Sequence, residues 1–241
     1  MKKRFFRPYV GRDYYRGFDN GKKVLVLGAS HYCAYNEDST KFNCPVWHEC
    51  TSLERKDSSP FNEACPYYRE MNGNTKKLED CTINELNHFL DGDEYTSYRN
   101  FTKLMMEKFN IGNEQSVWDR LAFANYVQYF VPYVTTPNQT RSDMVNFEAF
   151  METVDELNPD IVIVWGTKIP EHFSRGYIQK LVPVLEKQKN GYFWKLELNK
   201  HKIIIVNPYH PSDWGRAWSG NAGRFVDAFK YALNTPYDGE Y

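Results

Sequence analysis

The stretch VLVLGASHYC, residues 24–33, begins with an apolar run and ends in a polar tail. A second stretch, KIIIVNPYHPS at residues 202–212, has the same arrangement. Short runs of β-branched and aliphatic residues predict strands that are buried on both faces of a parallel sheet. Because ligands bind beyond the carboxyl ends of such strands, we expect the two tails to share one crevice.

Other segments of the chain complete a strand pattern. Apolar runs predict strands at Lys23–Leu27, Leu121–Val127, Asp160–Trp165 and Lys202–Val206. The alternating segment Tyr192–Leu198 precedes the last of these and predicts an antiparallel hairpin partner for it. Helical patterns lie between the strands, at Thr82–Leu90, Tyr98–Phe109, Arg141–Leu157, Gly176–Gln188 and Gly223–Leu233.

This alternation of strands and helices predicts an α/β fold, a three-layer α/β/α sandwich with a central, mainly parallel four-stranded sheet. A single domain is expected to span residues 1–241. Its one irregular part is a polar, cysteine-containing segment at about 34–81, which follows the first strand directly. A long segment at that place is expected to form a wall or lid of the crevice.

Composition narrows the class of protein. The net charge of −1 gives no bulk electrostatic indication of a nucleic-acid binder. No apolar run approaches the ~18 residues of a membrane-spanning helix. The polar amino-terminal sequence also lacks the apolar core of a signal peptide. We therefore expect a cytoplasmic protein with no membrane partner.

Three places along the chain offer candidate functional side chains. Gly28 permits a close approach of the backbone to a ligand, and Ser30 follows it at the end of the strand. His210 lies in a rigid Pro-Tyr-His-Pro setting, where an imidazole can donate to an oxygen that gains negative charge. Asn125 presents a donor and an acceptor suited to a nucleobase edge. The alternative for each is an ordinary loop or capping residue.

In their order along the chain, these motifs resemble those of the uracil-DNA glycosylase superfamily. The first motif, of the type Gly-x-(Asp/Asn)-Pro-(Tyr/Gly), corresponds to GASHY at Gly28–Tyr32. A strand ending in Asn corresponds to Phe123–Asn125, and a strand ending in Trp-Gly corresponds to Trp165–Gly166. A His-Pro-Ser loop corresponds to His210–Ser212. The resemblance covers roughly Lys23 to Leu233.

The resemblance implies base flipping, in which a nucleotide is rotated out of the stack into a pocket before its glycosidic bond is hydrolysed. Asn125 would bind the Watson–Crick edge of the base, and Tyr32 would pack against its C5 edge. Gly28 would allow the backbone to approach the base. His210 would stabilise the departing base anion through a hydrogen bond to its carbonyl oxygen.

The same resemblance implies a DNA-binding surface after the last strand. Ser212 would hold a phosphate beside the flipped nucleotide, Trp214 would supply a wedge into the vacated stack, and Arg216 would meet phosphate. The expected partner is DNA, single-stranded or carrying a modified base, and the expected state is a monomer. The hydrolysis needs no cofactor. Uracil or another damaged or modified base is the expected substrate.

The first motif departs from the family pattern. The water-activating acid or amide of the family corresponds to Ser30, which is a poor general base at neutral pH. His31 stands where proline is usual and is expected to position the water. A catalytically inactive nucleic-acid-binding relative is therefore an alternative. An ester hydrolase of the SGNH type, with Ser30 as nucleophile and His210 as base, is another.

The cysteines leave two interpretations open. An odd count of five cysteines, with no export signal expected, argues against a disulfide framework. Cys44, Cys50, Cys65 and Cys81 are candidate ligands of a structural zinc or iron–sulfur cluster that would order the insertion. Their spacing includes no Cys-x-x-Cys pair, so buried free thiols are the alternative.

Overall fold

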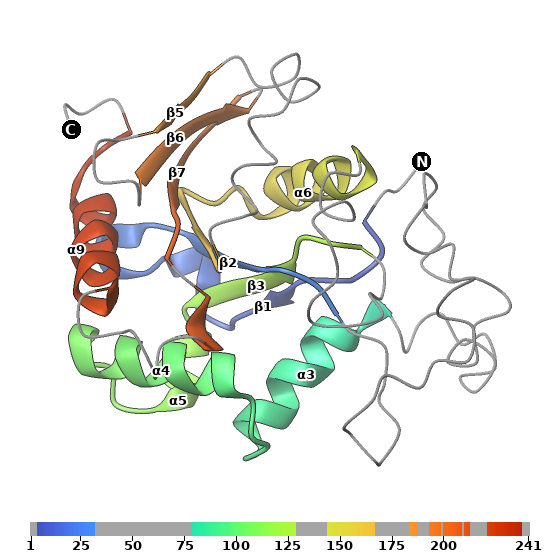
Figure 1. The fold of residues 1–241 in the computed structure, drawn as a ribbon, viewed down its shortest axis with the longest axis vertical. Coiled ribbons are helices and arrows are strands. Elements are labelled where there is room, and N and C mark those ends of the chain that lie inside the picture. Colours follow the sequence, from blue (N-terminus) through green and yellow to red (C-terminus); the bar gives the residue numbers. More distant parts are fainter. Residues whose placement is uncertain are drawn as a thin grey trace, which may run out of the picture.

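The computed structural model of the chain describes residues 4–31, 79–128, 144–166, 184–187, 193–198, 200–208, 210–212 and 221–237. The predicted insertion therefore lies almost entirely outside the described residues. Within them the fold is mixed α/β, built on one sheet (Figure 1). No described helix has both the length and the apolar character needed to cross a membrane.

The sheet has seven strands in the described part of the chain, in the order β1-β3-β2-β4-β7-β6-β5. The four in the middle, β3, β2, β4 and β7, run parallel to one another. The strands span Tyr9–Val10 (β1), Val24–Gly28 (β2), Leu121–Asn125 (β3), Ile161–Val164 (β4), Val184–Lys187 (β5), Phe193–Leu198 (β6) and His201–Val206 (β7).

The four apolar runs of the sequence form these middle strands, as predicted. All residues of β2, β3 and β4 are buried, which explains why the runs are apolar throughout instead of alternating. The predicted hairpin is also confirmed, because β6 pairs antiparallel with β7. The sheet is larger than the four strands predicted. Strands β1, β5 and β6 extend the sheet at its two edges through antiparallel pairs.

Helices cover both faces of the sheet (Figure 1). Val24 and Val26 of β2 pack in one hydrophobic cluster with residues of α3, α4, α5 and α9. Leu25 and Leu27 point to the other face, where they share a cluster with α6. The helices span Cys81–Leu90 (α3), Thr96–Phe109 (α4), Glu114–Trp118 (α5), Met144–Leu157 (α6) and Asn221–Asn234 (α9).

One predicted helix is wrong where the structure describes it. The pattern of residues 176–188 predicts a helix, but Val184–Lys187 is strand β5, and residues 176–183 and 188 lie outside the described part. Strand β5 pairs with the edge of β6 that faces away from β7. Satisfying the backbone groups of that edge outweighs the local helical preference, which is a weak determinant of structure.

An aromatic cluster fills the face of the sheet beneath α4 and α5. The ring of Trp118 lies 5.7 Å from that of Tyr98 and 5.9 Å from that of Phe123, measured between centroids. Its indole Nε1 donates to Thr102 Oγ1 at 2.8 Å. Trp118 and Thr102 are both completely buried, so this hydrogen bond satisfies a donor that water cannot reach.

Replacing Thr102 by Val should therefore destabilise the protein although the side-chain volume hardly changes. The Trp118 Nε1–H group would lose its acceptor in the core, which should lower the free energy of unfolding by about 1–3 kcal/mol. Urea denaturation monitored by tryptophan fluorescence measures this loss.

Thr153→Val is the matched control. Thr153 is also buried, but its hydroxyl donates to the Ala149 carbonyl one turn earlier in α6. That carbonyl accepts the helical hydrogen bond as well, so removing the hydroxyl leaves no group unsatisfied. Equal losses in the two variants would contradict the role given to Thr102.

Candidate functional site

A pocket of about 280 Å³ lies beyond the carboxyl ends of the four parallel strands. The strand ends supply its floor, and α3 and the start of α4 supply a wall. The residues that line it are Gly28, Ala29, Ser30, Glu85, Tyr95, Thr96, Ser97, Tyr98, Phe123, Asn125, Trp165, His210 and Ser212. The pocket thus brings together the two tails, as the strand pattern predicted, and adds the end of β3, which the family resemblance implied.

Backbone pairing and one side chain fix the second tail against β4. The Gly166 N–H donates to the Pro208 carbonyl at 3.1 Å, across the ends of β4 and β7. The buried Asn207 amide nitrogen donates to the carbonyls of Val164 and Gly166, both at 2.8 Å. Because these groups are shielded from water, the segment that carries His210 is held at the pocket.

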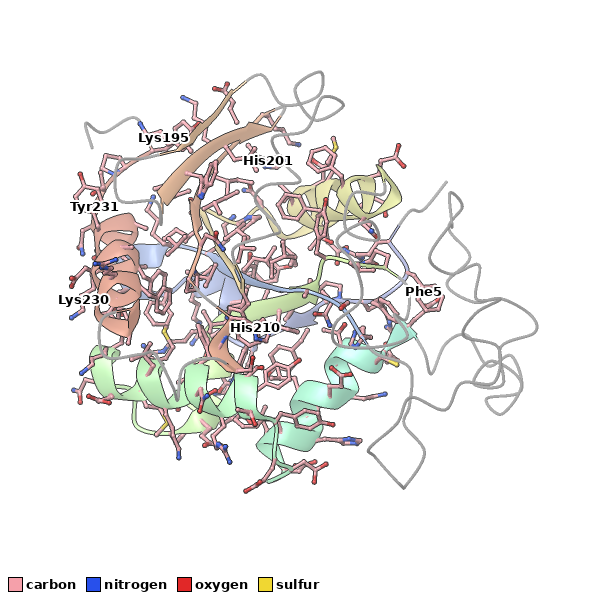
Figure 2. The ribbon with its side chains drawn as sticks, in the orientation of Figure 1. Phe5, Lys195, His201, His210, Lys230 and Tyr231 are labelled. Carbon is pink, nitrogen blue, oxygen red and sulfur yellow. The ribbon has the colours of Figure 1, made fainter. Side chains whose placement is uncertain are left out.

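The hydrogen bonds around His210 define the proton position of its neutral ring. Its Nδ1 lies 2.8 Å from Ser212 Oγ and accepts from the Ser212 backbone N–H at 3.3 Å. Nδ1 therefore carries a lone pair, and the proton is on Nε2. The ring packs edge-on against Trp165, with 6.1 Å between ring centroids. Figure 2 labels His210 beyond the carboxyl end of β7, far from His201 at the start of that strand.

Asn125 is the last residue of β3 and pairs in register with Gly28 of β2. Its side chain is only 6% exposed, and Nδ2 lies 3.1 Å from His31 Nε2. The amide oxygen occupies the space that a side chain on Gly28 would need. A Cβ at residue 28 would lie 2.4 Å from Asn125 Oδ1 and 2.8 Å from Phe123 Cζ. The glycine thus makes room for the amide.

His31 lies behind Asn125 and not on the pocket surface. It is 1% exposed, and the described residues that line the pocket do not include it. Its Nδ1 is 2.9 Å from Glu85 Oε1, and its Nε2 is 2.8 Å from Thr82 Oγ1. The sequence predicts His31 at the attacking water, but the structure places its ring among protein groups.

The other predicted site residues fall into two groups. Ser30 and Ser212 line the pocket. Tyr32, Trp214 and Arg216 lie outside the described residues, so their predicted roles at the base and at DNA stay predictions.

Sequence reasoning missed the contribution of α3. Glu85 is the only acidic residue among the described residues that line the pocket. Burial and the nearby Glu85 carboxylate raise the pKa of Tyr98 well above its ordinary value, so this tyrosine stays neutral. A signal was present in the sequence, because Thr82 and Glu85 are three residues apart on a predicted helix and so lie on one face.

The structure describes only one of the four cysteines that were predicted as metal ligands. Cys44, Cys50 and Cys65 lie outside the described residues, and Cys81 is the first residue of α3. The described part of the chain contains no group of three or more His, Cys, Asp or Glu side chains arranged to hold a metal ion. Burial, with the carboxylates of Glu85 and Asp80 nearby, raises the pKa of the Cys81 thiol to about 12.

Comparison with known proteins adds no family assignment: neither the family models nor the curated proteins that were searched match the chain. The functional argument therefore depends on the geometry of the pocket.

Gly28→Ala should disturb the pocket and the fold together. The added methyl group must displace the Asn125 amide or the Phe123 ring, and forcing extra volume into a packed site typically costs about 1–3 kcal/mol. Thermal or urea denaturation measures the loss.

As the control, Gly223→Ala adds a methyl group in α9 with no heavy atom within 4 Å. It should leave stability unchanged or raise it by up to about 1 kcal/mol. A Gly28→Ala variant as stable as wild type would contradict the tight contact.

The raised pKa of Cys81 predicts an unreactive thiol. Only the thiolate is alkylated, and a thiol with a pKa of about 12 stays protonated at pH 8. Iodoacetamide should therefore modify the Cys81 peptide about tenfold or more slowly in the folded protein than in urea, as followed by mass spectrometry. Equal rates in the two conditions would show that the thiol is not shielded.

Proposed function

We propose that the chain is a DNA glycosylase-like hydrolase that flips out uracil or another modified base and removes it. The proposal includes the fold of the uracil-DNA glycosylase superfamily, a three-layer α/β/α sandwich whose central sheet has the four parallel strands as its core. The observation that carries it is the meeting of Gly28, Asn125 and His210 around one pocket, although they come from distant parts of the sequence.

The pocket has the size and chemistry of a site for one base. Its volume of about 280 Å³ lies just below the range of about 300–1,000 Å³ that is typical of small-molecule sites. Phe123, Tyr98 and Trp165 supply aromatic surface on which a flipped base can stack. Asn125 supplies an amide donor and acceptor for its edge.

In the proposed mechanism, His210 assists departure of the base. Its neutral ring carries the proton on Nε2 and can donate to a base carbonyl oxygen as negative charge develops there. The Asn207 amide holds the backbone that leads to His210, and the Ser212 backbone N–H donates to Nδ1 of the imidazole itself. Because Ser30 is a poor general base, the route is dissociative, with bond cleavage preceding attack by water. No step uses a cofactor. DNA is the proposed partner of a monomeric protein.

The ester-hydrolase alternative fits the site less well. A catalytic histidine that activates serine donates its Nδ1–H to a carboxylate. Here Nδ1 of His210 accepts a hydrogen bond from Ser212, and the residue three positions earlier is Asn207. The Asn207 amide nitrogen donates to backbone carbonyls of β4 and the residues after it.

The test is an alkali-cleavage assay on labelled oligonucleotides that carry uracil, hypoxanthine or modified cytosines. Wild-type protein should generate abasic sites on at least one of them. His210→Ala should lower the rate of base release by about 100-fold or more, the usual effect of removing one donor from a developing oxyanion.

His88→Ala provides the matched control. This histidine lies on α3 with its side chain 60% exposed and does not line the pocket, so its loss should leave base release unchanged. Base release that survives in His210→Ala would overturn the mechanism. A wild-type protein that binds the oligonucleotides but releases no base would instead be a recognition protein with an inactive pocket.

A further inference from the structure

A buried chain of polar groups connects α3 to the amide of Asn125. Glu85 Oε1 lies 2.9 Å from His31 Nδ1, and His31 Nε2 lies 3.1 Å from Asn125 Nδ2. Thr82 Oγ1 approaches the same Nε2 at 2.8 Å. The His31 side chain is fully shielded from water, whereas that of Glu85 is 36% exposed. The ring of Phe6 packs against the imidazole with 4.5 Å between ring centroids, which fixes the plane of the ring.

With Asn125 Nδ2 facing the ring, these atom positions favour one proton arrangement of the neutral His31 imidazole. An amide nitrogen can only donate, so His31 Nε2 accepts from Asn125. The ring proton is then on Nδ1, where the Glu85 carboxylate, which can only accept, lies opposite it. The Thr82 hydroxyl, 2.8 Å from Nε2, then shares the single lone pair of that nitrogen with the amide. Each group thus fixes the role of the next, and the carboxylate determines the tautomer.

We propose that Glu85 and His31 are positioning residues that fix the orientation of the Asn125 amide and thereby select the base. This inference depends on the proposed function, because it concerns the edge that Asn125 binds. With Nδ2 held toward His31, Asn125 offers the pocket its Oδ1 as an acceptor and the second hydrogen of Nδ2 as a donor. In the proposed complex both residues act on the base through the Asn125 amide, although Glu85 also lines the pocket.

The fixed amide distinguishes two kinds of base edge. An acceptor beside a donor matches a ring N–H next to a carbonyl, as in uracil. The edge of cytosine has the opposite pattern, a bare ring nitrogen next to an amino group, and would need the amide turned over. Turning it over would place Oδ1 against the lone pair of His31 Nε2. The Glu85–His31 pair therefore penalises the cytosine-type edge.

Variants of Glu85 separate this role from the charge that Glu85 brings to the pocket. Glu85→Gln removes the charge but keeps an oxygen that accepts from Nδ1, so the tautomer should persist. Glu85→Leu removes the acceptor. Glu85→Lys places a donor opposite Nδ1, which should move the ring proton to Nε2 and turn the amide over.

The first measurement is independent of any glycosylase activity. Correlation of ring protons with ring nitrogens by NMR, in protein labelled at histidine, shows which nitrogen of His31 carries the proton. Wild type and Glu85→Gln should have it on Nδ1, and Glu85→Lys should have it on Nε2. A wild-type His31 with its proton on Nε2, or on both nitrogens, would overturn the inference whatever the protein does. This result needs only the wild-type protein and stands even where a variant fails to fold.

The second measurement is the ratio of uracil to cytosine release from matched oligonucleotides. Glu85→Gln should keep the wild-type ratio even where its absolute rate falls. Glu85→Leu should lower the ratio by about tenfold or more, equivalent to a difference of about 1.4 kcal/mol. An unchanged ratio in Glu85→Leu would refute the positioning role while leaving the glycosylase proposal intact. A wild type that releases no base would refute the proposed function, and the NMR experiment would still decide the orientation of His31.

Discussion

The pairing of β2 with β3 and β4 is the constraint on which the rest of the structure depends. In this parallel arrangement Gly28 is the register partner of Asn125, and Leu27 is the partner of Val164. The ends of three strands therefore coincide, so the segments that follow them leave the sheet at one place. The contact between Gly28 and the Asn125 amide oxygen is too close for any side chain on residue 28. The same register thus builds the core and the floor of the pocket.

Polar side chains reach this largely apolar pocket because the strands end there, and they stay ordered because protein groups satisfy their hydrogen bonds. The Asn207 amide donates hydrogen bonds to carbonyls at the end of β4. Ser212 forms hydrogen bonds with Nδ1 of His210. Asn125 is tied to His31, which is tied to Thr82 and Glu85. In a site of low dielectric, such networks fix both the positions and the proton locations of their members. That is the property that the proposed recognition of a base edge requires.

Helix α3 supplies two members of the network around His31. Thr82 and Glu85 face the sheet at His31, and Tyr98 from the following helix packs against Phe123, with 5.2 Å between ring centroids. His31 of the first tail is therefore buried instead of lying on the pocket surface. This arrangement gives His31 a structural role, because its ring supports Asn125 from behind.

The sequence by itself determined the four buried parallel strands and the hairpin after residue 192, because apolar runs and alternation report burial directly. It also determined that Gly28, Ser30, Asn125 and His210 lie at one pocket, since parallel strands bring their carboxyl ends to one edge. Only the tertiary structure decided the edge strand β5, the burial of His31 and the entry of Glu85 into the pocket. Those outcomes depend on which distant segment packs against a strand edge or a side chain, and local patterns carry no information about that partner.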